Sequence, residues 1–226
     1  METADSTSNF IDRLDETARD RLLRAMVTRN YDREEVVINQ HEISQDVFVL
    51  LEGTAQVTVY SEDGKAVAFR RIEAGDIFGE LAAIDARPRS ATVVALEPLS
   101  VGRLPVAAFR KITETVPAFT WALLGHLSQQ TRVLTDRIFE FSTMLVRERL
   151  VVELVRQAAN SGVESGVFEL RPAPTHFDLA AKISCHREAV SREMSRLTKA
   201  DLIAKTDGAL ILLDVAELAK LSPLGD

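Results

Sequence analysis

Cysteine is nearly absent from this sequence, and this excludes the protein classes that depend on it. Of the 226 residues, only Cys185 carries a thiol, which rules out a disulfide framework within one chain. A single thiolate also cannot hold a four-cysteine iron–sulfur cluster or a cysteine-rich zinc site. We therefore expect no structural metal and no redox cluster.

Long hydrophobic runs and an excess of positive charge are missing as well. The first residues, METADSTSNF, have neither the basic nor the apolar segment of a secretory signal. The apolar runs span only a few residues, whereas a membrane helix needs about 20. The net charge of −7 argues against a uniformly basic nucleic-acid-binding surface, although it does not exclude a local basic face. We expect a cytoplasmic protein that does not engage a membrane.

Short β-rich runs dominate the first half of the chain after a helical start. Residues 10–29 have the apolar spacing of one or two amphipathic helices. Between Glu35 and Leu104, runs rich in Val, Ile and Phe are separated by turn residues, which predicts a β-sandwich or β-roll. Asp63-Gly64 between two such runs predicts a hairpin. The runs read VVIN, VFVLLEG, AQVTVY, AVAFRRI, SATVVAL and SVGRL.

Apolar residues at heptad spacing follow in the middle of the chain. Their gaps of 3, 4, 3, 4 and 3 residues are typical of a coiled-coil seam. A helix with this stripe could equally pack on its own domain. A second helical pattern begins near Leu145, after a small polar break at 141–143, and favours a dimerisation helix followed by a hinge. The seam residues are Leu124, Leu127, Thr131, Leu134, Ile138 and Phe141.

Residues 175–197, THFDLAAKISCHREAVSREMSRL, predict two helices joined by a short turn. Thr175 would cap the first helix, Ser184-Cys185 would form the turn, and the second helix would begin near His186. The inward positions are apolar: Leu179, Ala180, Ile183, Ala189, Val190, Met194 and Leu197. The outward positions are polar: Arg187, Glu188, Ser191, Arg192 and Arg196.

The charge of this segment favours contact with DNA. From Lys182 to Lys199 five basic residues face two acidic ones, a local excess of three positive charges. Arginine pairs with guanine, and a carboxylate accepts from the cytosine amine. A solvated helix with internal pairs such as Glu188–Arg192 would explain the charges equally well. The hairpin pattern around Asp207-Gly208 adds the wing of a winged helix and favours double-stranded DNA as the partner. The expected contacts are Arg187, Glu188, Ser191, Arg192, Arg196 and Lys199.

The segment 74–95, AGDIFGELAAIDARPRSATVVA, combines the groups that a cyclic phosphate needs inside a β-roll. Gly79 permits close backbone approach, and Glu80 supplies an acceptor for a ribose hydroxyl. Arg89 supplies a forked cation, and Ser90 adds a hydroxyl donor. An alternative is that Glu80 and Arg89 form a buried ion pair in a pocket without a ligand.

The sequences GD at 75–76, FGEL at 78–81 and PRSAT at 88–92 resemble the phosphate-binding cassette of cyclic-nucleotide-binding domains. From about Asn9 to Asp214 the chain resembles the CRP/FNR family of transcription regulators, closest to its cyclic AMP receptor branch. This resemblance implies an α+β fold with a jelly-roll domain at 1–117, a dimerisation helix and hinge at 118–142, and a winged helix-turn-helix domain at 143–226. It also implies a homodimer that acts with RNA polymerase.

The resemblance assigns a role to each cassette residue. Glu80 would bind the ribose 2′-hydroxyl, and Arg89 and Ser90 would bind the cyclic phosphate. Replacing Arg89 by leucine should then abolish nucleotide binding and leave a folded dimer. Cyclic AMP is the first choice of effector and cyclic GMP the second. The surrounding backbone would come from Gly79, Leu81, Ala82 and Ala91.

The resemblance also implies which residues of the long helix lie near the base of the nucleotide, and which DNA sequence the protein binds. Thr135 keeps one of two hydroxyls that meet the adenine in this branch, whereas Leu134 departs from the pattern and removes the other. Arg187, Glu188 and Arg192 match the base-reading positions of the cyclic AMP receptor, so the expected operator is a palindrome with a TGTGA-like half-site.

Other functions can be set against this interpretation. The same scaffold could sense haem, a gas or redox state, or act without a ligand, but none of the four histidines lies in the cassette. A kinase-type regulatory subunit shares the cassette but lacks the helix-turn-helix. The sequence contains no nucleophile motif, Walker loop or clustered metal ligands, so we expect a binding protein rather than an enzyme.

Overall fold

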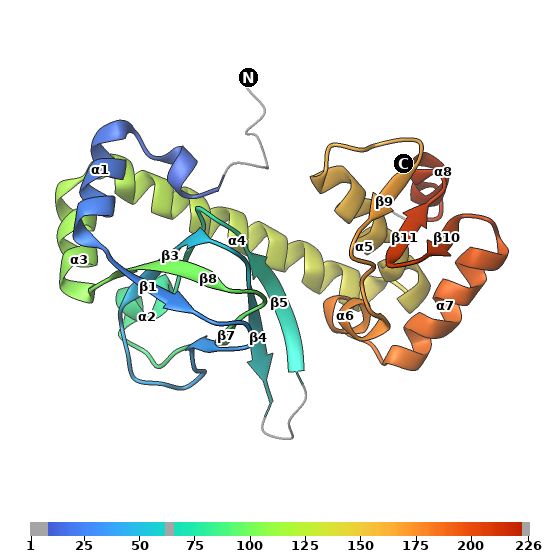
Figure 1. Ribbon diagram of the computed structural model, residues 1–226, viewed down its shortest axis with the longest axis horizontal. Coiled ribbons are helices and arrows are strands. Elements are labelled where there is room, and N and C mark those ends of the chain that lie inside the picture. Colours follow the sequence, from blue (N-terminus) through green and yellow to red (C-terminus); the bar gives the residue numbers. More distant parts are fainter. Residues whose placement is uncertain (1–8, 62–65, 223–226) are drawn as a thin grey trace. The chain divides into compact units, whose positions relative to one another are not determined.

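The computed structural model describes residues 9–61 and 66–222, and the chain divides into two units, one up to Thr131 and one from Arg132. In the first unit, antiparallel strands form two four-stranded sheets, ordered β1-β8-β3-β6 and β2-β7-β4-β5 (Figure 1). The strands are β1 Val27–Tyr31, β2 Val36–Ile38, β3 Val47–Glu52, β4 Ala55–Tyr60, β5 Ala66–Ile72, β6 Ile77–Phe78, β7 Thr92–Ala95 and β8 Leu99–Leu104.

The sequence of β3 explains how this unit buries two cores. Successive side chains of a strand point to opposite faces of its sheet. Phe48 and Leu50 therefore join the core between the two sheets, whereas Val47 and Val49 join a second core beneath the helices. Since all four side chains are buried, the run is continuously apolar rather than alternating.

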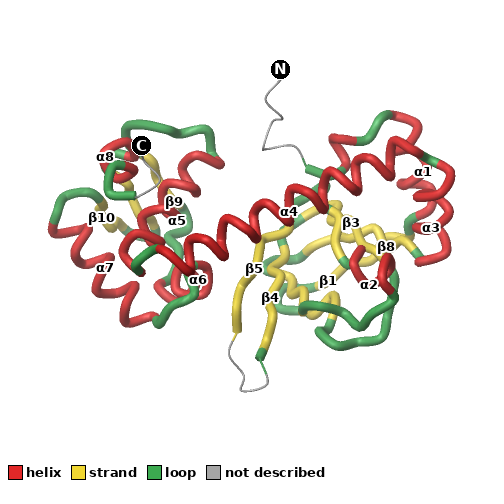
Figure 2. The backbone as a smooth tube through the Cα atoms, turned by 180° about the vertical axis from the view of Figure 1, so that it is seen from behind, coloured by secondary structure: helices red, strands yellow, loops and turns green. Residues whose placement is uncertain are grey.

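Helices cover the second core. Phe10, Leu22, Phe109 and Phe119 are among its buried residues, and Figures 1 and 2 both show α1 and α3 beside the first turns of α4. The helical elements are η1 Ile11–Arg13, α1 Glu16–Ala25, α2 Glu80–Asp85, α3 Val106–Thr115 and α4 Pro117–Thr143.

The predicted β-roll is confirmed, with one correction at its start. The helical prediction for residues 10–29 is wrong beyond Ala25, because Val27 begins β1 and lies opposite Arg103 of β8. The Asp63-Gly64 turn lies outside the described residues, although the strands on either side of it, β4 and β5, pair antiparallel as expected. Within the described residues no helix is both long and apolar enough to span a membrane.

The second unit contains the predicted winged helix-turn-helix. Its three-stranded sheet has the order β10-β11-β9, and Leu150, Leu154, Leu179, Met194 and Leu210 are among its buried core residues. The Asp207-Gly208 turn joins two paired strands, as the sequence predicts. The elements are α5 Val146–Asn160, β9 Phe168–Leu170, α6 His176–Lys182, α7 Arg187–Lys199, β10 Ile203–Thr206, β11 Ala209–Leu212 and α8 Val215–Ala219.

The break between α4 and α5 lies close to the predicted hinge. Helix α4 ends at Thr143 and α5 begins at Val146, where Glu148 accepts a hydrogen bond from the backbone N–H of Leu145 at 2.8 Å. The last turns of α4, from Arg132 onward, belong to the second unit. The three-part division at 117 and 142 stays a prediction.

Candidate functional site

Gly79 is the single residue that connects the end of β6 to the start of α2. Its φ of 79° is left-handed, a conformation that glycine adopts without strain. A Cβ at this position would lie 2.9 Å from Nη1 of Arg89 and 3.1 Å from Cδ1 of Ile38. The close approach of backbone and guanidinium therefore requires glycine here.

The Arg89 side chain is 3% exposed, and its three nitrogens each donate one hydrogen bond. Nε donates to Oγ of Ser44 at 2.9 Å, Nη1 to the carbonyl of Gly79 at 2.8 Å, and Nη2 to the carbonyl of Asp46 at 2.7 Å. A guanidinium has five N–H donors, so these bonds within the described part of the chain use three of them. One donor remains on each terminal nitrogen.

Asp46, which accepts a hydrogen bond from Arg89, is itself held in place by two further contacts. Its carboxylate accepts from Nε of Arg103 at 2.6 Å and from the backbone N–H of Val106 at 3.2 Å, while its carbonyl binds Arg89. The guanidinium also lies over the ring of Phe48, at 5.9 Å from the centroid. Sequence reasoning missed Ser44 and Asp46 because they lie more than 40 positions before Arg89, and no local motif marks them.

Glu80 begins α2 as a buried carboxyl group, 7% exposed. Burial raises the pKa of Glu80, against the opposing effects of its own backbone N–H and the positive charges of Arg70 and Arg89. Burial also lowers the pKa of Arg89, which nearby carboxylates, first of all Glu42, partly counteract. Among the described residues, the hydrogen bonds of Arg89 go to a hydroxyl and two carbonyls rather than to Glu80.

The other predicted effector residues divide into two groups. Ser90 is exposed and Ala91 partly buried, close to Arg89 in the chain, whereas Leu81 and Ala82 lie in α2, 46% and 4% exposed. Leu134 and Thr135 lie on α4 beyond Thr131 and belong to the second unit. Their approach to the cassette stays a prediction.

The predicted DNA-reading residues share one face of α7. Val190, Met194 and Leu197 point into the core, as expected. Ser191 is only partly exposed, because its Oγ lies 2.7 Å from Nδ1 of His176. The exposed members are Arg187, Glu188, Arg192, Arg196 and Lys199.

The local structure around this face supports the helix-turn-helix. Thr175 caps α6 as predicted, since its Oγ1 accepts from the backbone N–H of Asp178 at 3.1 Å. On α7, Arg196 Nε pairs with Glu193 at 2.9 Å, so one of the candidate arginines has an acidic partner within the helix. Sequence reasoning missed His176 because an isolated histidine after a capping residue carries no signal of its own.

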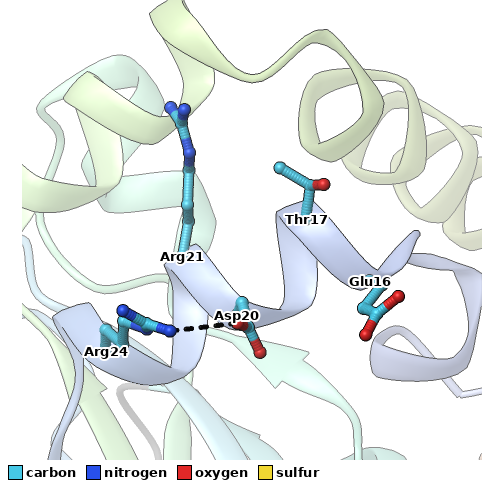
Figure 3. A pocket seen from close by; sticks show the side chains of 5 residues that line it. All are labelled: Glu16, Thr17, Asp20, Arg21 and Arg24. Atoms are coloured by element: carbon cyan, nitrogen blue, oxygen red, sulfur yellow. Dashed lines mark hydrogen bonds and ion pairs between the residues drawn. The ribbon is translucent and has the colours of Figure 1, made fainter.

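A surface hollow is lined by residues of α1 that belong neither to the predicted effector site nor to the predicted DNA-reading residues. Figure 3 shows its five labelled side chains, all from α1, and an ion pair of 3.2 Å between Arg24 and Asp20. Both side chains of that pair are exposed, so the pair contributes little to binding or stability.

Comparisons with known proteins identify both units. Residues 28–116 match the cyclic nucleotide-binding domain family, and residues 148–221 match the Crp-like helix-turn-helix domain family. The chain is 36% identical over 119 residues to a cAMP-dependent protein kinase regulatory subunit of Mycosarcoma maydis, covering 53% of this chain and 21% of that protein. The matching stretch thus spans about a fifth of the kinase subunit.

Two further proteins match over most of the chain. The chain is 22% identical to the cAMP-activated global transcriptional regulator CRP of Salmonella typhimurium, over 77% of this chain and 83% of that protein. Its fold resembles that of the c-di-GMP-responsive regulator CLP of Xanthomonas campestris, with a TM-score of 0.78 and 17% identity over 88% of this chain and 99% of CLP. A cyclic-nucleotide-binding domain followed by a Crp-like helix-turn-helix places the chain in the CRP/FNR family of transcription regulators.

Proposed function

We propose that this regulator responds to a cyclic nucleotide that binds at Gly79, Glu80, Arg89 and Ser90. The observation that carries the proposal is the buried guanidinium of Arg89, which is held by three hydrogen bonds and keeps one donor on each terminal nitrogen. Donors on two nitrogens of one guanidinium suit two oxygens of one phosphate. Gly79 leaves room for the backbone to approach, and the Glu80 carboxylate supplies the acceptor for a ribose hydroxyl.

Cyclic AMP is the first choice of effector. The names of the kinase regulatory subunit and of CRP both refer to cyclic AMP, whereas the structural neighbour CLP is described as responsive to c-di-GMP. Leu134 removes one hydroxyl from the expected base contact, and this makes cyclic GMP the second choice. Thr135 retains a hydroxyl that can donate or accept.

Titration calorimetry with cyclic AMP, cyclic GMP and c-di-GMP tests the effector directly. We expect cyclic AMP to bind most tightly, and Arg89→Leu to lose about two to three decades of affinity because a buried phosphate loses its charged partner. Arg87→Leu is the matched control, since Arg87 lies two positions away and its side chain is 82% exposed. Equal binding by both variants would show that the cassette assignment is wrong.

We also propose that the chain acts as a homodimer through α4. Apolar seam residues are exposed in the single chain: Leu124 is 50% exposed, Leu134 42% and Ile138 65%. A stripe of this kind at heptad spacing is typical of a coiled-coil interface. Sedimentation of the ligand-bound protein at micromolar concentration should give a dimer, and a monomer would contradict the proposal.

The dimer would bind a palindromic operator through the two α7 helices, about one turn of DNA apart, roughly 34 Å. Arg187, Glu188 and Arg192 would read a TGTGA-like half-site from the major groove, with Ser191, Arg196 and Lys199 at its edges. RNA polymerase in the cytoplasm is the further partner of such a regulator. Selection of duplexes from a random pool would identify the half-site.

A further inference from the structure

Three polar side chains from three elements meet beside the DNA-reading face of α7. His176 begins α6, and its Nδ1 lies 2.7 Å from Oγ of Ser191 on α7. Its Nε2 lies 2.9 Å from Nζ of Lys205 on the wing strand β10. Lys205 is exposed, and Ser191 directly precedes the predicted base-reading Arg192. This cluster therefore joins the wing to the edge of the candidate DNA surface.

The chemistry of the two contacts defines the state of the imidazole ring. An ammonium group can only donate hydrogen bonds, so Lys205 must donate to a bare Nε2. The ring proton then resides on Nδ1, which donates to Ser191. His176 is thus neutral in this arrangement. If His176 became protonated, Nε2 and Lys205 would both be donors, and they would need a shared acceptor in place of their own contact. An anion suits this position best, because it also compensates the two positive charges.

We propose that a DNA backbone phosphate occupies this position, held by Lys205 and a protonated His176, so that operator binding takes up a proton at each subunit. The inference rests on the proposed DNA-binding function. It assigns a contact that sets the affinity and the pH dependence of binding rather than the choice of base, because phosphate contacts carry no sequence information directly.

The charged groups around His176 determine the sign of the effect. Burial lowers the pKa of His176 in the free protein, and the positive charges of Lys205 on β10 and Arg187 on α7 lower it further. On its own helix, the Asp178 carboxylate is occupied by Thr175. A phosphate beside the ring would raise the pKa, since an opposite charge favours the charged form. Binding therefore takes up a proton and becomes tighter as the pH falls.

The test measures operator affinity of the full-length protein with saturating cyclic AMP at pH 7.5 and pH 6.0, at fixed ionic strength, with a duplex selected from a random pool. We expect about a threefold gain from each subunit, or about tenfold per dimer, for the wild type. His176→Gln should abolish this gain. His186→Gln is the matched control, because His186 is an exposed histidine that directly precedes α7, and it should keep the gain.

Lys205→Gln supplies a second variant, at an exposed position on β10. Log affinity falls as log salt concentration rises. Loss of one phosphate contact per subunit should make this slope less steep by about 2 per dimer. A merely structural tether predicts something else: His176→Gln would weaken binding equally at both pH values and leave the salt slope unchanged. That result, or loss of the pH effect in His186→Gln, would overturn the inference. If the wild type bound no duplex at either pH, the proposed function itself would fail.

Discussion

Removal of Glu153 should strongly destabilise the second unit, because this buried carboxylate holds together a cluster of positive charges. Glu153 is 3% exposed, and Arg156 and Lys182 lie within 3.0 and 3.2 Å of it. Arg137, on α4, pairs with Glu153 at 3.9 Å and also donates to the carbonyl of Lys182 at 2.8 Å. The cluster thus connects the end of α4 to α5 and α6.

The expected magnitude follows from the charges that remain. The cluster holds three cations and two buried carboxylates, Glu153 and Glu140, and Glu140 pairs with Arg156. Without Glu153, three partly exposed cations share one carboxylate, so the excess of positive charge in the cluster rises from one to two. Breaking a fully buried ion pair by removing one partner costs about 3–5 kcal/mol. Solvent reaches the three cations, whose side chains are 19%, 32% and 36% exposed, and lowers this cost to about 2 kcal/mol. We expect Glu153→Ala to lower the free energy of unfolding by this amount.

Urea unfolding of the full chain, followed by far-ultraviolet circular dichroism, measures the effect. Glu164→Ala is the control, since Glu164 is an exposed acidic residue in the loop after α5, and it should change the free energy by no more than about 0.5 kcal/mol. A double-mutant cycle with Lys182→Ala isolates the ion pair. If Glu153→Ala cost less than about 1 kcal/mol, the reasoning from the buried charges would be refuted.

Three further predictions concern pH, effector binding and DNA sequence. Burial lowers the pKa of His126 from 6.5 to about 4, so the stability that its neutral form contributes is present above pH 6.5 and is lost as the pH falls through 4. The free energy of unfolding should fall by about 3 kcal/mol over this range, at about 1.4 kcal/mol per pH unit. His126→Leu should therefore flatten the acid side of a pH–stability curve. Arg89→Leu should lower the melting temperature as well as nucleotide affinity, because it leaves two partly buried carbonyls and a hydroxyl without their donor; an unchanged melting curve would contradict this. Arg192→Ala should relax base preference at one operator position by about 1–3 kcal/mol, whereas Lys199→Ala should weaken all sequences alike, and an intact motif in the Arg192 variant would exclude α7 as the reader.

Sequence patterns predicted the elements whose residues are neighbours in the chain. The period of the apolar residues revealed most strands of the roll, the long helix and the helix-turn-helix, because each pattern is local. The helical prediction for residues 10–29 runs into the start of β1 because Val27 continues the apolar spacing of Leu22 and Leu23. The pairing of β1 with β8, about 70 positions later in the chain, makes this segment a strand.

The residues that support the sites were not predictable in the same way. Ser44 and Asp46 orient Arg89 through contacts more than 40 residues apart. Glu153 lies in the run LVVELVR, where a single acidic residue is typical of a solvated helix face, and only the fold shows that it is buried. His176 gains its role from a serine on α7 and a lysine on β10. Such groups depend on tertiary contacts that no spacing rule marks.

The affinity of the protein for cyclic AMP, measured by calorimetry with and without operator duplex, tests the central claim most directly. If the nucleotide favours the form that binds DNA, then by linkage the operator must tighten nucleotide binding by the same factor. We expect the affinity for cyclic AMP to rise about tenfold when the operator is present. Equal affinity with and without operator would contradict a cyclic-nucleotide-responsive regulator.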